Sequence, residues 1–264
     1  MPPLLDLGGR TWFLAGQSSQ PAELWSTDGT PAGTERSSVF AAANPPVEVA
    51  LAAELTGGRF VYTANSALYG ERIFLGGAAL PSAEPIAPSV PMTEPSGLVS
   101  WRGLGWFIAR QAGGNRRLWR TDGTAAGTVL VTLPTSVGTG ALEVLPGDAD
   151  LQVAGDRLYF SSRILEDRLF VMADPSSSAV DLGLFGTGGL FSPSQDVLEE
   201  FGEANGRLVF TTTSAASGLE LWASDGTIAG TQEIFDIWPG AANSSPRFIA
   251  SDGALQWFTA RTPG

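Results

Sequence analysis

A twelve-residue stretch, ELWSTDGTPAGT over residues 23–34, dominates the sequence. It returns as RLWRTDGTAAGT over residues 117–128 and as ELWASDGTIAGT over residues 220–231. Three copies of so long a pattern do not arise by chance. They indicate that the chain is an array of similar structural units.

A second recurring feature lies between these motifs, where a glycine is followed by a short aromatic-rich run. The last aromatic residue of each run marks a register, and these residues are Phe13, Tyr62, Phe107, Phe160, Phe210 and Phe258. Successive members are about fifty residues apart. The chain also holds 33 glycines and 18 prolines, which favour many short elements with tight turns over long helices. This period and composition predict a β-propeller or a β-solenoid.

Each unit can be divided into four predicted strands. The first precedes the glycine turn, as in residues 49–55, and the second is the aromatic run. The third carries Glu-Leu-Trp, and the fourth follows the final Gly-Thr, as in residues 128–133. Two-residue hairpin turns are expected at Gly57-Gly58, Asn205-Gly206 and Asp252-Gly253, because both turn positions tolerate a positive φ. Four strands in a unit correspond to one propeller blade.

The sequence therefore predicts an all-β propeller over residues 1–264, with five complete four-stranded blades and a partial sixth. The predicted units are 3–44, 45–92, 93–138, 139–191 and 192–242, and residues 243–264 supply the first hairpin of the sixth. A partial blade leaves strand edges unpaired. We therefore expect either a two-stranded last blade or, the favoured interpretation, a fragment of a longer array.

Composition excludes several functional classes. Of 264 residues, 43 % are hydrophobic and 16 % are charged, which is typical of a globular protein. The net charge of −12 repels phosphate backbones, so we expect no nucleic-acid partner. The absence of cysteine and histidine removes disulfides, thiol nucleophiles and every Ser-His triad. We also expect no signal peptide in residues 1–8 and no segment that inserts in a membrane.

The repeated motif, together with FDIWPG over residues 235–240, resembles the ELWxxDGT repeat family of bacterial proteins. The resemblance covers units 1, 3 and 5 in full. Units 2 and 4 keep the strand pattern but carry ERIFLGG over residues 71–77 and DRLFVMADP over residues 167–175 instead. The resemblance implies propeller-forming tandem β repeats in exported or cell-surface bacterial proteins. It implies no established activity and no catalytic residues.

The aspartates of the motif, Asp28, Asp122 and Asp225, have two interpretations. Each precedes Gly-Thr at the end of a strand, where a carboxylate can accept backbone N–H groups and fix a turn. The alternative is a calcium ligand, because carboxylate, hydroxyl and carbonyl oxygens are the atoms that Ca²⁺ prefers. One carboxylate in each loop is few for a cation that takes six to eight oxygens, so the structural turn is favoured.

The motif tryptophans, Trp25, Trp119 and Trp222, are also ambiguous. Leucine and tryptophan are adjacent on the third strand and so point to opposite faces of the sheet. We favour tryptophan as the packing layer between blades, with a stacking platform for sugars as the alternative.

The remaining carboxylates of interest are Glu23, Glu220, Asp196, Glu199 and Glu200, with Asp148 and Asp150 in a loop. On so acidic a chain, we interpret them first as solvated surface residues. Paired carboxylates could instead perform glycoside hydrolysis, and Asp148 with Asp150 could hold a cation weakly.

Three functional hypotheses follow. The favoured one is a non-catalytic binding or scaffold module of an exported or cell-surface bacterial protein, whose ligand is a glycan or a protein. The second is a carboxylate-based glycoside hydrolase or lyase that acts at the central channel. The third is a calcium-stabilised structural array, and Ca²⁺ is the one cofactor considered.

Overall fold

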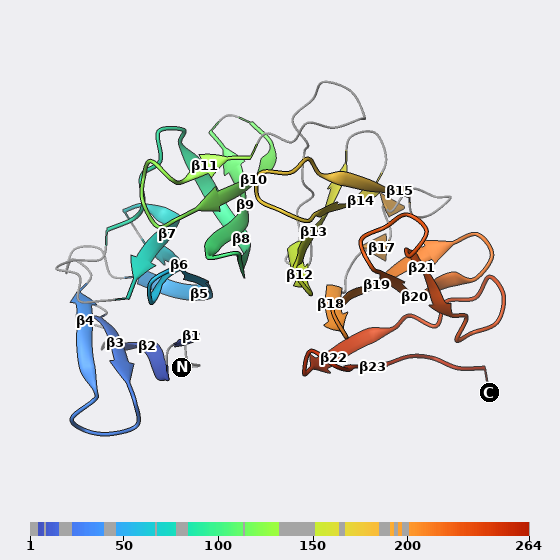
Figure 1. Ribbon diagram of the computed structural model, residues 1–264, viewed down its shortest axis with the longest axis horizontal. Coiled ribbons are helices and arrows are strands. Elements are labelled where there is room, and N and C mark those ends of the chain that lie inside the picture. The colour runs from blue at the N-terminus through green and yellow to red at the C-terminus, as the bar shows by residue number, and fades with distance from the viewer. Residues whose placement is uncertain are drawn as a thin grey trace. The chain divides into compact units, whose positions relative to one another are not determined.

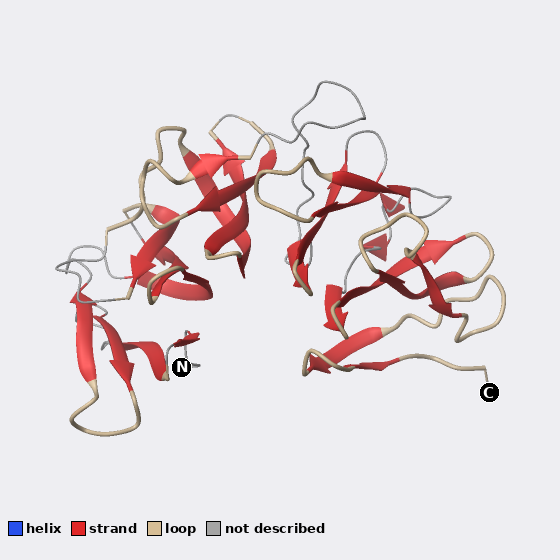
Figure 2. Ribbon diagram, in the orientation of Figure 1, coloured by secondary structure: helices blue, strands red, loops and turns tan. Residues whose placement is uncertain are grey.

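The computed structural model describes residues 5–7, 9–15, 23–39, 46–66, 68–77, 84–112, 114–131, 151–163, 167–184, 191–192, 195–196 and 201–263. Within these residues every regular element is a β-strand, as Figure 2 shows. The chain divides into two compact units, an N-terminal unit over Met1–Val131 and a C-terminal unit over Thr132–Gly264. The prediction of an all-β fold is confirmed.

The N-terminal unit contains three antiparallel sheets that follow one another along the chain (Figure 1). The first sheet consists of β1 (Leu5–Leu7), β2 (Arg10–Ala15), β3 (Glu23–Thr27) and β4 (Glu35–Val39). The second consists of β5 (Pro46–Leu55), β6 (Arg59–Ser66) and β7 (Gly70–Gly76). The third consists of β8 (Met92–Trp101), β9 (Leu104–Gln111), β10 (Arg116–Thr121) and β11 (Val129–Leu130).

The C-terminal unit repeats this organisation. One sheet consists of β12 (Leu151–Ala154), β13 (Arg157–Arg163), β14 (Asp167–Met172) and β15 (Val180–Leu184). The next consists of β18 (Phe201–Ala204), β19 (Arg207–Ser214), β20 (Gly218–Ser224) and β21 (Gln232–Phe235). A two-stranded sheet, β22 (Arg247–Ser251) with β23 (Gln256–Thr259), follows. A small hairpin of β16 (Phe191–Ser192) and β17 (Gln195–Asp196) was not predicted.

In every four-stranded sheet the strands are neighbours in the order of the sequence, as expected for propeller blades. The second sheet differs from the prediction, because its described part has three strands and one isolated bridge, between Phe74 and Pro85. The last sheet has two strands, as predicted for a partial sixth unit. Closure of a ring, the number of blades and the unit boundaries stay predictions.

One of the three expected two-residue turns is confirmed. Asn205 and Gly206 have φ of 52° and 72°, and Ala204 pairs with Arg207 on either side of them. The other two predictions were wrong about loop length. Leu55 pairs with Arg59, which leaves three residues in the loop. The N–H of Thr56 in this loop donates to the carbonyl of Gly103, in the turn between β8 and β9, at 3.0 Å.

The third turn is longer because an aspartate organises it. The Asp252 carboxylate accepts the N–H groups of Ala254 at 2.9 Å and of Leu255 at 2.8 Å. These bonds draw two further residues into the loop, so Ser251 pairs with Gln256.

The six register residues have a structural meaning. In each sheet with a third strand, the register residue of the second strand lies directly opposite an aromatic residue of the third. These cross-strand pairs are Phe13–Trp25, Tyr62–Phe74, Phe107–Trp119, Phe160–Phe170 and Phe210–Trp222. Three of them are stacked, with ring centroids 5.6 Å apart in Tyr62–Phe74 and Phe160–Phe170 and 6.3 Å apart in Phe107–Trp119.

The hydrophobic core consists of layers between successive sheets. One cluster joins the first two sheets, with Leu24, Phe60, Tyr62 and Phe74 among its members. A second joins the next two sheets and contains Trp119, which is fully buried. A third joins the two four-stranded sheets of the C-terminal unit. Within each unit, neighbouring sheets thus bury apolar side chains against each other, as repeat architectures require.

The motif tryptophans are not equivalent in this core. Trp119 lies inside the layer, as predicted, and Trp222 packs against the layer of the C-terminal unit while partly buried. Trp25 is half-buried, and its indole N–H donates to the Glu23 carboxylate at 2.9 Å. A fully buried ring cannot stack on a sugar, so the stacking alternative is wrong for Trp119.

We predict that Trp119→Ala lowers the free energy of unfolding of the N-terminal unit by about 3–5 kcal/mol, because it leaves a cavity in a closed layer. Trp25→Ala is the matched control at the same motif position, and we expect a loss below about 2 kcal/mol there. Urea unfolding followed by far-UV circular dichroism measures both. Equal losses would contradict the layer model.

Candidate functional site

The three motif turns share one hydrogen-bond network. In the second copy, the Asp122 Oδ1 atom accepts the backbone N–H of Thr124 at 2.8 Å and its hydroxyl at 2.7 Å. The same hydroxyl oxygen accepts the N–H of Gly127 at 2.9 Å. Thr128 donates its hydroxyl to the carbonyl of Thr124 at 2.6 Å and lies 2.6 Å from the hydroxyl of Thr121.

The first and third copies repeat these bonds. Asp28 accepts the backbone N–H and the hydroxyl of Thr30 at 2.9 and 2.7 Å. Asp225 accepts the same groups of Thr227 at 2.9 and 2.7 Å. In the third copy Ser224 replaces the first threonine and keeps its hydroxyl contact with Thr231, at 2.7 Å. The network explains why hydroxyl residues recur at three positions of the motif.

Both glycines of the motif are required by this geometry. Gly123 has a φ of +89°, which a side chain would strain. A Cβ on Gly127 would overlap the Asp122 carboxylate, which lies against its backbone. The equivalent glycines, Gly33 and Gly230, meet Asp28 and Asp225 in the same way.

The bonds also set the charge of the aspartates. Donation by the threonine hydroxyl, followed by donation from its backbone N–H, holds the pKa of Asp28, Asp122 and Asp225 below the ordinary value of 3.8. All three carboxylates are therefore charged at neutral pH. Each uses one oxygen to close its own turn, which supports the structural interpretation of these residues.

The described residues contain no group of three or more acidic side chains close enough to hold a metal ion. Each motif turn brings one carboxylate, whereas Ca²⁺ takes six to eight oxygens. The calcium interpretation of Asp28, Asp122 and Asp225 stays a prediction, which can be tested directly.

We predict that Gly127→Ala lowers the free energy of unfolding by about 1–3 kcal/mol, because the new methyl group displaces the Asp122 carboxylate from its turn. Gly114→Ala is the matched control, since its Cβ would find its nearest atoms at 3.7 and 3.8 Å. We expect a change below about 1 kcal/mol there. Chemical denaturation measures both variants, and a neutral Gly127→Ala would refute the role given to the second glycine.

We predict that the melting temperature is the same in EDTA and in millimolar Ca²⁺. A cation that binds only the folded protein would add about 2.7 kcal/mol at a hundredfold excess over Kd. Thermal melts of the wild type and of the triple variant Asp28→Asn, Asp122→Asn, Asp225→Asn decide between the interpretations. A calcium-dependent rise that the triple variant loses would make the turns metal sites.

Glu220 requires a correction. The sequence placed it among solvated carboxylates, but it is fully buried, with a relative exposure of 0 %. Its carboxylate accepts the N–H of Ile237 at 3.1 Å, and the N–H and hydroxyl of Ser244 at 3.0 and 2.6 Å. It therefore fixes the segment that leads from β21 to β22.

The FDIWPG segment over residues 235–240, which contains Ile237, follows only the third motif. In the first motif Glu23 bonds to Trp25 and Arg36 instead, and in the second motif Arg117 stands at this position. Comparison of the three motif copies at this position therefore did not reveal that the Glu220 carboxylate is buried.

The structure gives no side-chain geometry for the other candidate carboxylates. Asp148, Asp150, Glu199 and Glu200 lie outside the described residues. Asp196 ends β17. The paired-carboxylate and weak-cation hypotheses for these residues stay predictions.

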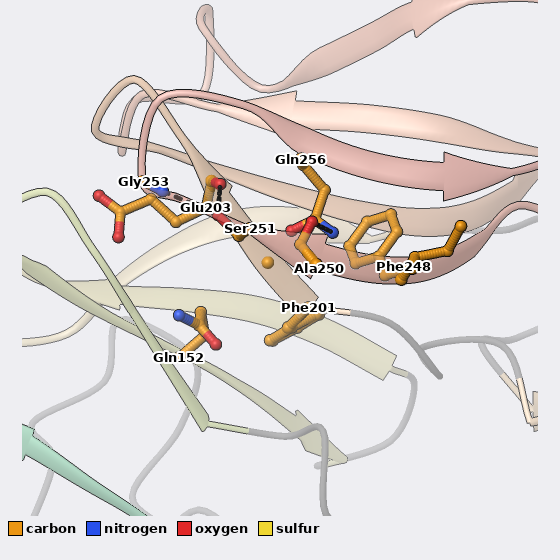
Figure 3. Close-up of a pocket in the computed structure, with 10 residues that line it drawn as sticks. Gln152, Phe201, Glu203, Phe248, Ala250, Ser251, Gly253 and Gln256 are labelled. Carbon is orange, nitrogen blue, oxygen red and sulfur yellow. Dashed lines mark hydrogen bonds between the residues drawn. The ribbon is translucent and has the colours of Figure 1, made fainter. Parts of the chain in front are cut away.

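An open cavity of about 440 Å³ lies in the C-terminal unit (Figure 3). It is lined by the first strands of successive sheets, β12, β18 and β22, and by the start of β23. Two phenyl rings, Phe201 and Phe248, contribute apolar surface. The Gln256 carboxamide and the Phe248 ring pack against Gly202, where a Cβ would overlap the first and crowd the second.

The polar side chains of the cavity are held in place by hydrogen bonds to backbone groups. Gln152 donates its Nε2–H to the carbonyl of Val153 at 2.7 Å. Gln256 donates to the carbonyls of Ala250 and Trp257 at 2.9 and 3.1 Å. One oxygen of Glu203 accepts the N–H of Gly155 at 2.9 Å. None of the described residues donates a hydrogen bond to the carboxamide oxygens of the two glutamines or to the second Glu203 oxygen, so these oxygens can accept hydrogen bonds from a ligand.

Sequence reasoning singled out none of these residues. They lie on or next to strands that precede or begin an aromatic run, but they share no sequence motif. The lining contains one carboxylate, that of Glu203, whereas glycoside hydrolysis of the usual kind needs two that face each other. The cavity therefore fits ligand binding better than hydrolysis.

A scan against protein-family models and a search of curated proteins both gave no match. Among solved structures, one from a study of two prolyl endopeptidases matches with a TM-score of 0.55 and 13 % identity. It is matched over 94 % of this chain and 36 % of its own length. This similarity supports a propeller-like fold and bears on the fold alone.

Two other solved structures match this chain more weakly. TolB from Acinetobacter baumannii matches with a TM-score of 0.44 and 12 % identity, over 84 % of this chain and 50 % of its own. A GH43 β1,3-galactosidase matches with a TM-score of 0.40 and 7 % identity, over 99 % and 93 %. The chain thus spans half or less of the length of the first two proteins.

In the part of the chain that the structure describes, no helix is long and apolar enough to span a membrane.

Proposed function

We propose that the protein is a non-catalytic binding module whose ligand is a glycan, held in the cavity between β12, β18 and β22. The observation that supports this proposal is the combination of two phenyl rings with acceptor oxygens in one open cavity. Sugars present an apolar face of C–H groups and a rim of hydroxyl donors. Phe201 and Phe248 offer surface to the first, and Gln152, Glu203 and Gln256 accept from the second.

The negative charge of the protein and of its cavity indicates which glycans can bind. The net charge of −12 and the Glu203 carboxylate in the cavity disfavour sulfated or uronic-acid sugars. Neutral oligosaccharides therefore fit this cavity best. The binding needs no cofactor.

The propeller architecture and the cellular location of the protein are part of the same proposal. Sheets of four strands, joined in chain order and stacked through apolar layers, support a propeller of successive blades. The resemblance of the motif to the ELWxxDGT repeats supports an exported or cell-surface bacterial protein. A protein ligand is the competing outcome, and the absence of glycan binding would favour it.

We predict that the protein binds neutral oligosaccharides on a glycan array, and that Phe201→Ala and Gln152→Ala each weaken the best ligand at least about tenfold. Calorimetric titration measures the affinities. Phe235→Ala and Gln232→Ala are the matched controls, because they remove the same groups from exposed β21, away from the cavity.

Three results would contradict this proposal. The array could show no bound glycan, or the cavity variants could bind as tightly as the wild type. The protein could also release reducing sugar from the bound glycan, which would make it a hydrolase.

A further inference from the structure

The hairpin of β22 and β23 forms one wall of the cavity, and its tip is tied to the preceding sheet. The hydroxyl of Ser251, at the end of β22, donates to the carbonyl of Glu203 in β18 at 2.8 Å. The N–H of Asn205 donates to the carbonyl of Gly253, in the hairpin turn, at 2.9 Å. These two bonds fix one end of the cavity wall.

The base of the hairpin is tied to the same sheet through Ser244. Ser244 is fully buried and lies three residues before β22. Its N–H and its hydroxyl donate to the two carboxylate oxygens of Glu220, at 3.0 and 2.6 Å. Beyond β23, the N–H of Arg261 donates to the carbonyl of Ser244 at 2.7 Å. The segments that enter and leave the hairpin therefore meet at the residue that Glu220 holds.

Further contacts hold the segment before the hairpin on β20. The N–H of Leu219 donates to the side-chain oxygen of Asn243 at 2.9 Å, and the carbonyl of Leu219 accepts the N–H of Ser245 at 3.3 Å. Gly218 begins β20 with a φ of +69°, and a Cβ there would overlap the carbonyl oxygen of Ala242. The segment thus lies directly against the start of β20.

The turn that leads from this contact into β22 is strained. Ser245 has a φ of +49°, in the left-handed region that a side chain disfavours, and a proline follows it. A residue keeps such a conformation only where its surroundings enforce it. Glu220 holds the residue immediately before Ser245. The direction in which β22 leaves the turn therefore depends on the bonds to Glu220.

We propose that Glu220 is a positioning residue of the glycan cavity, which holds the hairpin wall in place through Ser244. This inference rests on the proposed function of the cavity. The hairpin residues Phe248 and Gln256 lie on one side of the cavity and Gln152 of β12 lies on the other (Figure 3). Glu220 itself does not line the cavity, so it acts on the ligand through the hairpin alone.

The contacts of Glu220 suit a carboxylate and not an amide. One oxygen accepts the N–H of Ser244, and the other accepts the hydroxyl of Ser244 and the N–H of Ile237. A glutamine presents an NH₂ group in place of one oxygen, so that a donor then faces a donor. Glu220→Gln thus keeps the shape of the side chain and breaks at least one bond that holds the hairpin.

The free protein provides the first test, because Trp257 of β23 is 46 % exposed and does not line the cavity. In protein labelled with fluorotryptophan, fluorine NMR reports the surroundings of each indole, and Trp257→Phe assigns this signal. We expect Glu220→Gln to shift or broaden the Trp257 signal while hydrogen exchange of the β19 amides stays unchanged. A general loss of stability would speed exchange in β19 as well. An unchanged Trp257 signal would overturn the proposal.

Ligand affinity provides the second test, with maltohexaose, cellohexaose and laminarihexaose as neutral oligosaccharides in calorimetric titrations. We expect Glu220→Gln to weaken the tightest of them at least about tenfold. Ser244→Ala removes the hydroxyl alone and should weaken it less. Glu233→Gln is the matched control and should bind as the wild type does, since Glu233 of β21 accepts the hydroxyl of Ser217, immediately before β20.

The two tests separate this proposal from the proposed function. Equal affinities of Glu220→Gln and the wild type would overturn the positioning role and leave the glycan site intact. Absence of binding by the wild type would refute the glycan ligand instead. The Trp257 signal would then decide alone whether Glu220 holds the hairpin.

Discussion

The structure depends on a cross-strand pair of aromatic residues, which recurs in every described sheet that has a third strand. Phe107 with Trp119 shows the arrangement, with stacked rings buried in the layer between two sheets. A single small sheet cannot bury both of its faces, so each unit gains stability only by stacking on its neighbours. The aromatic pair thus sets the strand register and supplies the packing surface at once.

The Asp-Gly-Thr turns that the three motif copies share and the candidate binding cavity lie on different strands. The Asp-Gly-Thr turns end the third strands, and their carboxylates and hydroxyls are occupied in closing the turn. The cavity lies on the first strands β12, β18 and β22, which carry Gln152 and Glu203, and on the start of the second strand β23, which carries Gln256. A repeat scaffold of this kind keeps its turns constant and varies the residues that face a ligand.

The sequence was sufficient for the all-β class, for the strand order within sheets and for the burial of Trp119, because a long motif and a regular aromatic period encode them. It was misleading where tertiary contacts override local pattern. Glu220 is buried because the chain returns over it through Ile237 and Ser244, which no local pattern reveals. Asp252 lengthened its turn by bonding two later N–H groups. The cavity was missed because its residues are distant in sequence and share no motif.

Amide hydrogen exchange, resolved residue by residue, tests most directly the claim that stacked sheets and cross-strand aromatic pairs hold the protein together. The account predicts the slowest exchange in β6, β9, β13 and β19, the second strands that are paired on both sides and carry fully buried side chains. It predicts faster exchange in β23, which among the described strands pairs with β22 alone. Equal protection of β23 and β19, or second strands that exchange as fast as the outer strands, would contradict it.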